Sequence, residues 1–278
     1  ETTARFFRER GISPSDAELS AIQTDTYGYP LALGILARHM QDGTPYSAEM
    51  NAQLRRELYV HYETAVYRRF EVPMRQLLLN LAPFETFDIE LARMASGNSR
   101  AEELIDWLQR NTTMLQYDSV DRFHFWFIFR DFLLWEMERE YSAERRSALF
   151  RRGGLYYELH EDYSHALECY ARGEDHLKIS DLLVRSAEMP ASMGHSSELE
   201  KYYKLLPEQE ILTSPALMQA MSMLCALRTD YEESERWYHE LESFAVRCER
   251  KDALRKQARS RLAWLDISLP QRGVGGLE

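Results

Sequence analysis

The stretch DRFHFWFIFRDFLLWEMERE, residues 121–140, decides the fold of this chain, because a strand-like pattern passes directly into a helix-like one. Nine of the 13 positions from Phe123 to Trp135 are aromatic or leucine. Polar residues interrupt the run, so it is shorter than the roughly 18–20 apolar residues that a membrane helix needs. The run is therefore expected to pack inside a protein.

Within this stretch, FHFWF (123–127) is predicted to be a strand and IFRDFLLWEMERE (128–140) a helix. Helical spacing places Ile128, Phe132 and Trp135 on one face, whereas Arg130 and Glu138 should point elsewhere. The density of aromatic side chains is typical of a junction that packs on two sides.

The residues before it complete a recognisable pattern. TMLQYDSVDRFHFWF (113–127) predicts two short strands around the polar turn DSVD. Two short helices come first: DIELARMASGN (88–98) stops at Gly97, and SRAEELIDWLQRN (99–111) starts with a Ser99/Glu102 capping box. The second helix should turn four residues inwards: Leu104, Ile105, Trp107 and Leu108. Helix, helix and hairpin in this order is the pattern of a winged helix.

The charge of the second helix indicates what it contacts. Arg100 and Arg110 are outnumbered by Glu102, Glu103 and Asp106, a net of −1. Helices that bind phosphates are basic, so this one is expected to pack against protein. The formal charge of −11 for the whole chain also argues against binding to nucleic acid or to an anionic membrane by charge.

Upstream of the winged helix the chain is predicted to be helical. Ser13 is the expected cap of a helix over 13–27, and TYGYPLALGILARHM (26–40) breaks at Gly28 and Pro30 before continuing as an apolar helix. A long amphipathic helix follows over roughly 48–70, with its apolar face formed by Leu54, Leu58, Tyr62 and Val66. Another helix begins after Pro73 and ends near Pro83.

From about residue 143 the sequence is repetitive. FRRGGLYYELHEDYSHALECY (150–170) has the spacing of a tetratricopeptide helix pair, with Gly154 and Ala166 small enough for close contact. Aligning Asp162-Tyr163 with Asp230-Tyr231 gives an offset of 68, about twice a 34-residue period. A middle unit near SSELEKYYKLLP (196–207) is degenerate. Tyr156, Tyr157, Tyr202 and Tyr203 are expected in the repeat core rather than in a ligand site.

No catalytic constellation is present in the sequence. It contains no GxxxxGK(S/T), GxGxxG or GxSxG. HEDYSH (160–165) resembles a zinc-protease HExxH, but its histidines are five residues apart, so they do not share a helix face. The remaining histidines are scattered, and Cys169, Cys225 and Cys248 form no CxxC pair, which fits buried thiols in a reducing cytoplasm. We therefore expect no metal site and no enzyme activity.

Three segments in order resemble one family: TYGYPLALGILARHM, then LLNLAPFETFDIELARMASGN with ELIDWLQRNTTMLQ, then FHFWFIFRDFLLWEME. They are similar to the middle of the large LuxR-type transcriptional activators related to the maltose-regulon activator, a branch of the STAND ATPases. The resemblance covers roughly residues 15–175. It implies an upstream P-loop ATPase domain and a downstream helix-turn-helix. The chain begins without methionine and ends GVGGLE, so we expect a piece of such a protein that lacks both.

The resemblance also implies a nucleotide contact. The family places a glycine-x-proline turn against the nucleotide base, which corresponds to Gly28, Tyr29 and Pro30; proline offers a rigid apolar surface to a purine. These residues would contact ATP or ADP in the full-length protein, with no cofactor in this piece. Where the family has a histidine and a proline, this chain has Trp126 and Phe127, so a nucleotide-sensing role is not transferred to His124.

The predicted fold is mostly α: a partial helical domain, a winged helix with a small β-hairpin, then a tetratricopeptide-like α-superhelix. The expected divisions are 1–72, 73–142 and 143–278. The expected function is the regulatory core of a STAND-class LuxR-type activator, with an effector on the repeats and with its own ATPase and DNA-binding domains as partners. It would itself bind neither nucleic acid nor membrane. A tetratricopeptide scaffold without a nucleotide switch is the alternative.

Overall fold

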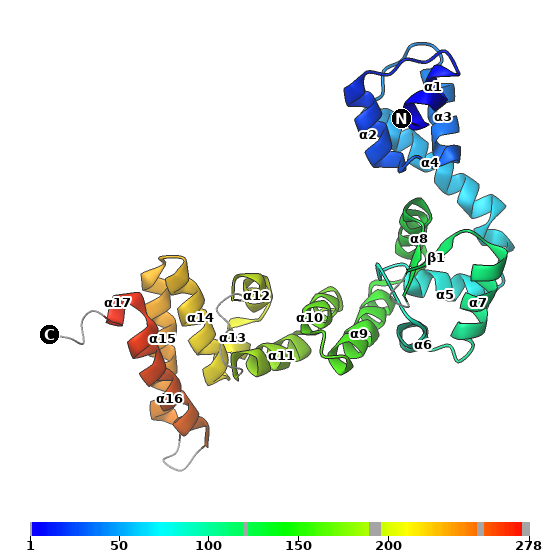
Figure 1. The fold of residues 1–278 in the computed structure, drawn as a ribbon. Helices are drawn as coiled ribbons and strands as arrows, with labels where there is room; N and C mark the ends of the chain where they lie inside the picture. Colours follow the sequence, from blue (N-terminus) through cyan, green and yellow to red (C-terminus); the bar gives the residue numbers. More distant parts are fainter. Residues whose placement is uncertain (1, 119–121, 189–195, 249–252, 274–278) are drawn as a thin grey trace. The chain divides into compact units, whose positions relative to one another are not determined.

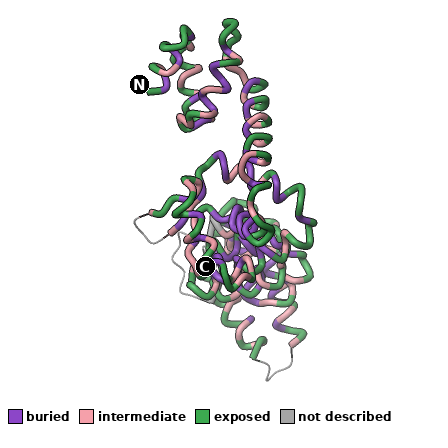
Figure 2. The backbone as a smooth tube through the Cα atoms, turned by 90° about the vertical axis from the view of Figure 1, so that its right-hand side faces the viewer, coloured by how far each residue is buried: buried purple, intermediate pink, exposed green. Residues whose placement is uncertain are grey.

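Two compact units make up the chain, Glu1–Ser142 and Ala143–Glu278. The structure is a computed structural model that describes residues 2–118, 122–188, 196–248 and 253–273. Each unit encloses its own buried core, and buried residues recur at intervals along the helices of each (Figure 2). The finer division of the first unit at residue 72 stays a prediction.

The first unit is helical apart from one hairpin (Figure 1). Its elements are α1 (Thr2–Arg8), α2 (Asp16–Thr26), α3 (Pro30–Met40), α4 (Ala48–Ala65), η1 (Tyr67–Arg69), α5 (Val72–Leu81), α6 (Ile89–Ser96), α7 (Ala101–Asn111), β1 (Leu115–Tyr117), β2 (Phe123–Phe125) and α8 (Phe127–Glu140). The long helix α4 buries Leu54, Leu58 and Tyr62 along one face, as the apolar spacing predicts. It ends at Ala65, short of the expected residue 70, so Val66 lies just past the helix, and the 3₁₀ turn η1 continues the chain towards α5.

The predicted hairpin and the helix after it are confirmed. β1 pairs antiparallel with β2, with Leu115 opposite Phe125 and Tyr117 opposite Phe123. Phe87 adds a bridge to the outer side of β2, exchanging two backbone hydrogen bonds with Phe123 at 2.9 and 2.7 Å. Most of the DSVD turn lies outside the described residues. Helix α6 ends as expected at Gly97, whose φ of 63° suits a residue without a side chain.

Two predicted helix caps are wrong. The cap of α2 is Ser15, not Ser13: Ser15 and Glu18 form a reciprocal capping box, which leaves Pro14 just outside the helix. Ser99 does not cap α7 either, because the side chain of Asn98 accepts a hydrogen bond from the backbone of Arg100 at 2.9 Å and makes the turn one residue later. At α2 a neighbouring serine takes the capping role, whereas α7 begins after Arg100 without any side-chain cap.

Three side chains also lie differently from the predicted helix faces. Trp107 and Trp135 are partly exposed rather than buried with their neighbours. Arg130 points inwards: its Nε donates to the carbonyl oxygen of Ala82 at 2.8 Å and its Nη2 to that of Pro83 at 3.0 Å. Periodicity places a residue on a helix face, but the neighbouring helices decide how much of that face is covered.

The second unit consists of packed helix pairs. Its helices are α9 (Ala143–Leu159), α10 (Tyr163–Arg172), α11 (His176–Glu188), α12 (Ser196–Tyr203), α13 (Glu208–Ile211), α14 (Pro215–Leu227), α15 (Tyr231–Arg247), α16 (Ala253–Ser268) and α17 (Pro270–Gly273). Helix α9 packs on α10 and α14 packs on α15. Gly154 is needed for the first contact, because a Cβ there would lie 2.6 Å from the ring of Tyr170. The four tyrosines predicted in the repeat core are all buried.

The predicted offset of 68 residues is visible in the backbone. Asp162 and Asp230 each cap the second helix of a pair, with φ and ψ of −88° and 73° in one and −88° and 75° in the other. Each follows a non-glycine residue with positive φ, Glu161 or Thr229. Ala166 and Ser234, also 68 apart, are both fully buried between helices. The two pairs are therefore built on the same turn.

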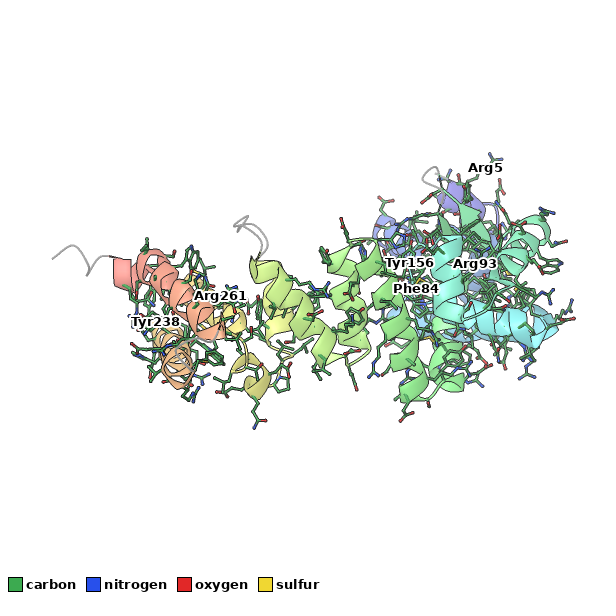
Figure 3. The ribbon with its side chains drawn as sticks, turned by 90° about the horizontal axis from the view of Figure 1, so that it is seen from below. Arg5, Phe84, Arg93, Tyr156, Tyr238 and Arg261 are labelled. Carbon is green, nitrogen blue, oxygen red and sulfur yellow. The ribbon has the colours of Figure 1, made fainter. Side chains whose placement is uncertain are left out.

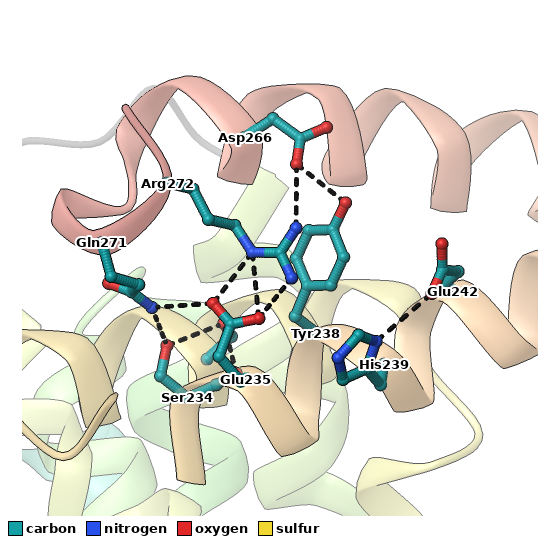
Figure 4. Close-up of polar contacts among 9 residues, drawn as sticks. Ser234, Glu235, Tyr238, His239, Glu242, Asp266, Gln271 and Arg272 are labelled. Atoms are coloured by element: carbon teal, nitrogen blue, oxygen red, sulfur yellow. Dashed lines mark hydrogen bonds and ion pairs between the residues drawn. The ribbon is translucent and has the colours of Figure 1, made fainter. Parts of the chain in front are cut away.

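The C-terminal helices are tied together by a polar network on α15 (Figure 4). Arg272 of α17 donates from Nε to Glu235 at 2.8 Å, and its guanidinium lies 3.5 Å from the ring centre of Tyr238. The hydroxyl of Tyr238 in turn donates to Asp266 of α16 at 2.7 Å. Tyr238 and Arg261 come from the neighbouring helices α15 and α16 (Figure 3). Within the described residues, no helix is both long enough and apolar enough to cross a membrane.

Candidate functional site

The turn between α2 and α3 holds the three residues expected to contact a nucleotide. Two residues in a row take positive φ, Tyr27 at 50° and Gly28 at 72°. Tyr29 is the extended cap of α3, and Pro30 occupies the first helical turn, where its missing N–H costs nothing. Gly28 is suited to this conformation, whereas Tyr27 holds it with a side chain and is strained by comparison.

Tyr27 brings this turn against the start of α8. Its ring lies 4.6 Å from that of Phe127, at an interplanar angle of 45°. Tyr27 is 57% exposed and Phe127 38% exposed, so the contact lies at the surface. Trp126, the cap of α8, immediately precedes Phe127 in sequence and is 41% exposed. We call Tyr27, Trp126 and Phe127 the aromatic cluster.

Tyr29 has a packing role in this turn. Its ring stacks on that of Tyr62 at 6.4 Å, and Tyr62 lies against Phe129 and Phe132 of α8. Burial, and then the hydrogen bond with Tyr29, raise the pKa of Tyr62. Tyr29 is half-buried, whereas Pro30 is exposed. Of the three predicted contact residues, Pro30 presents its side chain most openly to solvent.

A continuous contact between α4 and α8 supports the site. Arg55 of α4 pairs with Asp131 of α8, and both side chains are partly buried. One turn further along, the ring of Tyr59 lies 6.0 Å from that of Phe132 and 5.2 Å from that of Trp135. The α2–α3 turn is thus connected to the winged helix through the buried face of α4.

The wing itself presents a different surface. His124 lies on β2 opposite Gln116, and its Nε2 is 2.8 Å from the amide oxygen of that residue. Trp126 lies beyond the strand, in the cap of α8, so the alternation expected for a strand over 123–127 stops at Phe125. His124 and Trp126 therefore belong to different elements, and we assign a nucleotide-sensing role to neither residue.

The basic residues flanking α7 are neutralised locally. Arg100 Nε lies 2.8 Å from Glu103 Oε2, and Arg110 Nη2 lies 3.3 Å from Asp106 Oδ2. Glu102 pairs with Arg93 of α6. Each carboxylate of α7 thus has an arginine beside it, and the helix offers acidic and basic groups in alternation rather than a cationic face.

The described residues hold no group of three or more His, Cys, Asp and Glu side chains that could bind a metal ion. The HEDYSH histidines serve other contacts: His165 Nδ1 lies 2.8 Å from the cap residue Asp162, and His160 stacks against Tyr156 at 4.2 Å. His195 lies outside the described residues.

The sequence comparison places one segment of the chain. Residues 63–145 match the family model described as the MalT winged helix domain. This segment is a MalT-type winged helix domain. Such domains are found in MalT-like STAND regulators, and the match covers less than half of the chain. The domain starts in the last turn of α4 and ends in the first turn of α9. No curated protein matches the chain.

The match confirms the predicted winged helix and adds the end of α4 to it. It does not reach Gly28, Tyr29 and Pro30, whose contact with a nucleotide stays a prediction. Sequence reasoning missed two long-range contacts: Tyr27 with Phe127, which joins the turn to α8, and Arg55 with Asp131, which joins α4 to α8. The exposed pair of aromatics at 126–127 was the one available signal, because large apolar residues at a helix cap are unusual.

Proposed function

We propose that this chain is the regulatory core of a STAND-class, LuxR-type transcriptional regulator. The observation that carries the proposal is the MalT-type winged helix domain over residues 63–145. In this proposal the chain transmits the state of a nucleotide switch, located in an upstream ATPase domain, to a downstream DNA-binding domain. The chain itself performs no catalysis and holds no cofactor.

The α2–α3 turn supports a role in that switch. Pro30 is exposed and shares this turn with Tyr27, whose ring contacts Phe127, so the turn offers apolar surface suited to the flat face of a purine. In the intact protein we place Gly28, Tyr29 and Pro30 against the base of ATP or ADP. Tyr29 packs on Tyr62, and Tyr62 packs on Phe132 of α8. A nucleotide that moves the turn would therefore also shift the packing of the winged helix domain.

The helix pairs of the second unit are proposed as the sensor. An effector, a small molecule or a protein, would bind there and favour one arrangement of the domains, since a ligand shifts an equilibrium only by its differential affinity. The partners within the full-length chain are then its own ATPase and DNA-binding domains. The locally paired charges of α7 support a protein contact, with no direct binding to nucleic acid and none to a membrane.

The test uses the intact gene product. We expect ATP together with an effector to drive its oligomerisation and promoter-dependent transcription. Pro30→Ala should weaken activation at limiting ATP, whereas Pro14→Ala, the control in the loop before α2, should not. The proposal is wrong if the gene encodes neither an upstream P-loop nor a downstream helix-turn-helix.

A tetratricopeptide-type scaffold without a nucleotide switch is the second candidate. It is favoured by the shared turn at Asp162 and Asp230, which repeats a helix-pair unit at twice the tetratricopeptide period. This candidate predicts peptide binding by the second unit and no response of the intact protein to ATP. The same ATP experiment therefore separates the two candidates.

A further inference from the structure

A cavity of about 610 Å³ lies in the winged helix region, between the segment 69–74 and α7. Its apolar lining comes mainly from Phe70, Met74, Leu104 and Trp107. Arg69 and Arg100 stand at its edge. This volume falls within the range of roughly 300–1,000 Å³ that is typical of small-molecule sites.

The cavity has the shape of an aromatic corner. The rings of Phe70 and Trp107 meet edge to face, 6.0 Å apart at an interplanar angle of 88°. Met74 is buried beneath them, whereas Trp107 is 46% exposed. Leu104 and Trp107 are three positions apart on α7, so they line the same side of the helix. Because these two rings already contact each other, a flat apolar group can pack against the exposed part of Trp107 but not between the rings.

Two arginines, Arg69 and Arg100, line the cavity together with Glu71. Arg100 is already occupied, since Glu103 and, more weakly, Glu71 raise its pKa. Arg69 is exposed and forms no ion pair within the part of the chain that the structure describes. Of the two arginines that line this cavity, Arg69 is therefore the one without an ion pair among the described residues. An arginine of this kind binds a carboxylate through two parallel hydrogen bonds.

We propose that this cavity binds a small aromatic carboxylate, with its ring packed against Trp107 at the Phe70–Trp107 corner and its carboxylate on Arg69. The site joins η1 and the start of α5 to α7, so an occupant would hold these segments together. It is distinct from the α2–α3 turn and from the helix pairs, and it stands whether or not the proposed function does.

The test titrates the 278-residue chain with indole-3-acetate and with the neutral indole-3-acetamide, followed by ligand-observed NMR. A ligand of this size should bind with a dissociation constant on the order of 0.1–1 mM. The carboxylate should bind about tenfold more tightly than the amide because only the carboxylate pairs with Arg69. No binding of the carboxylate at 10 mM, roughly ten times the weakest expected constant, would overturn the proposal.

Two variants locate the binding. Arg69→Gln should reduce the carboxylate-to-amide ratio to about one, whereas Arg110→Gln, an exposed arginine at the other end of α7, should leave it unchanged. Trp107→Ala should abolish binding of both ligands, whereas Trp264→Ala, also partly exposed, should not. In the unaltered chain, the methyl resonance of Met74 should shift on titration. Unchanged affinities in both site variants, or an unshifted Met74, would show that the ligand binds elsewhere.

Discussion

Two carboxylates with little exposed surface, Glu136 and Glu158, have pKa values shifted in opposite directions. Glu136 of α8 lies beside Glu63 and Glu140, and burial raises its pKa although Arg139 opposes the shift. Burial alone would also raise the pKa of Glu158 in α9. Hydrogen bonds from Tyr170 and Lys178, with the charge of Arg185, instead lower it. The number of donors around each group decides the direction.

Glu136→Gln should therefore raise the thermal stability of the chain at pH 7 by a few degrees. A folded-state pKa above the unfolded value means that ionised Glu136 lowers stability at neutral pH, and the cost disappears as the pH falls below the ordinary glutamate pKa of 4.5. Thermal unfolding by circular dichroism at pH 7 and pH 4 measures this. Glu138→Gln, an exposed residue of the same helix, is the control; equal shifts in both variants would contradict the prediction.

Glu158→Gln should have the opposite effect, a loss of about 1–3 kcal/mol at pH 7, because a charged acceptor for three donors is removed. Because the folded-state pKa is lowered, this stabilisation is fully present above the ordinary glutamate pKa of 4.5, and it is lost as the pH falls through the folded pKa. The difference between the variant and the unaltered chain should shrink in acid. Urea unfolding at two pH values tests this, with the exposed Glu168→Gln as control.

At the scale of elements, the spacing of helices depends on a few small residues. Gly154→Ala should destabilise the chain by about 1–3 kcal/mol, because the added Cβ would lie 2.6 Å from the ring of Tyr170. Gly34→Ala, in the interior of α3 with no atom within 4 Å of the new Cβ, should instead stabilise by about 1 kcal/mol through helix propensity. Urea unfolding compares the two; a gain at both positions would mean that α9 and α10 pack less closely.

Elements of this chain were predictable where local patterns act alone. The hairpin and α8 follow from alternation and helical spacing in residues 113–140. Gly97 is needed for the positive φ that ends α6, and Gly154 for the close contact with Tyr170. Caps were less predictable, because Ser13 and Ser15 both suit the start of α2 and the choice depends on Glu18. The exposure of Trp107 could not be predicted, since it depends on where segment 69–74 runs.

At the scale of the whole molecule, each unit has enough buried apolar residues to form a core of its own. We expect chains of residues 1–142 and 143–278, expressed separately, each to fold cooperatively. Glu136→Gln should then raise the unfolding midpoint of the first chain only, and Glu158→Gln should lower that of the second chain only. Circular dichroism and denaturant titration of the two chains check this, and a non-cooperative transition in either would contradict it.

The candidate site was predictable only in part at this scale. The turn at Gly28 and Pro30 was visible because both residues punctuate an apolar run. Its contact with Phe127 joins residues 27 and 127, and no local pattern specifies a pairing over such a separation. The Arg55–Asp131 pair has the same character. Sequence placed the parts of the site, and tertiary packing brought them together.

The side chain of Arg130 has a consequence for how the winged helix region assembles. It supplies hydrogen bonds to two carbonyl oxygens at the end of α5, from a position 47 and 48 residues later in the chain. Until α8 has packed against α5, those carbonyl oxygens can accept hydrogen bonds only from water. The buried side chain of Asn80 likewise gains a hydrogen bond from the hydroxyl of Tyr141, which follows α8 in the chain. The end of α5, the hairpin and α8 should therefore form in one late kinetic step. In that case φ-values at Arg130 and in the hairpin would be equal, and a high value in the hairpin alone would show that the wing nucleates first.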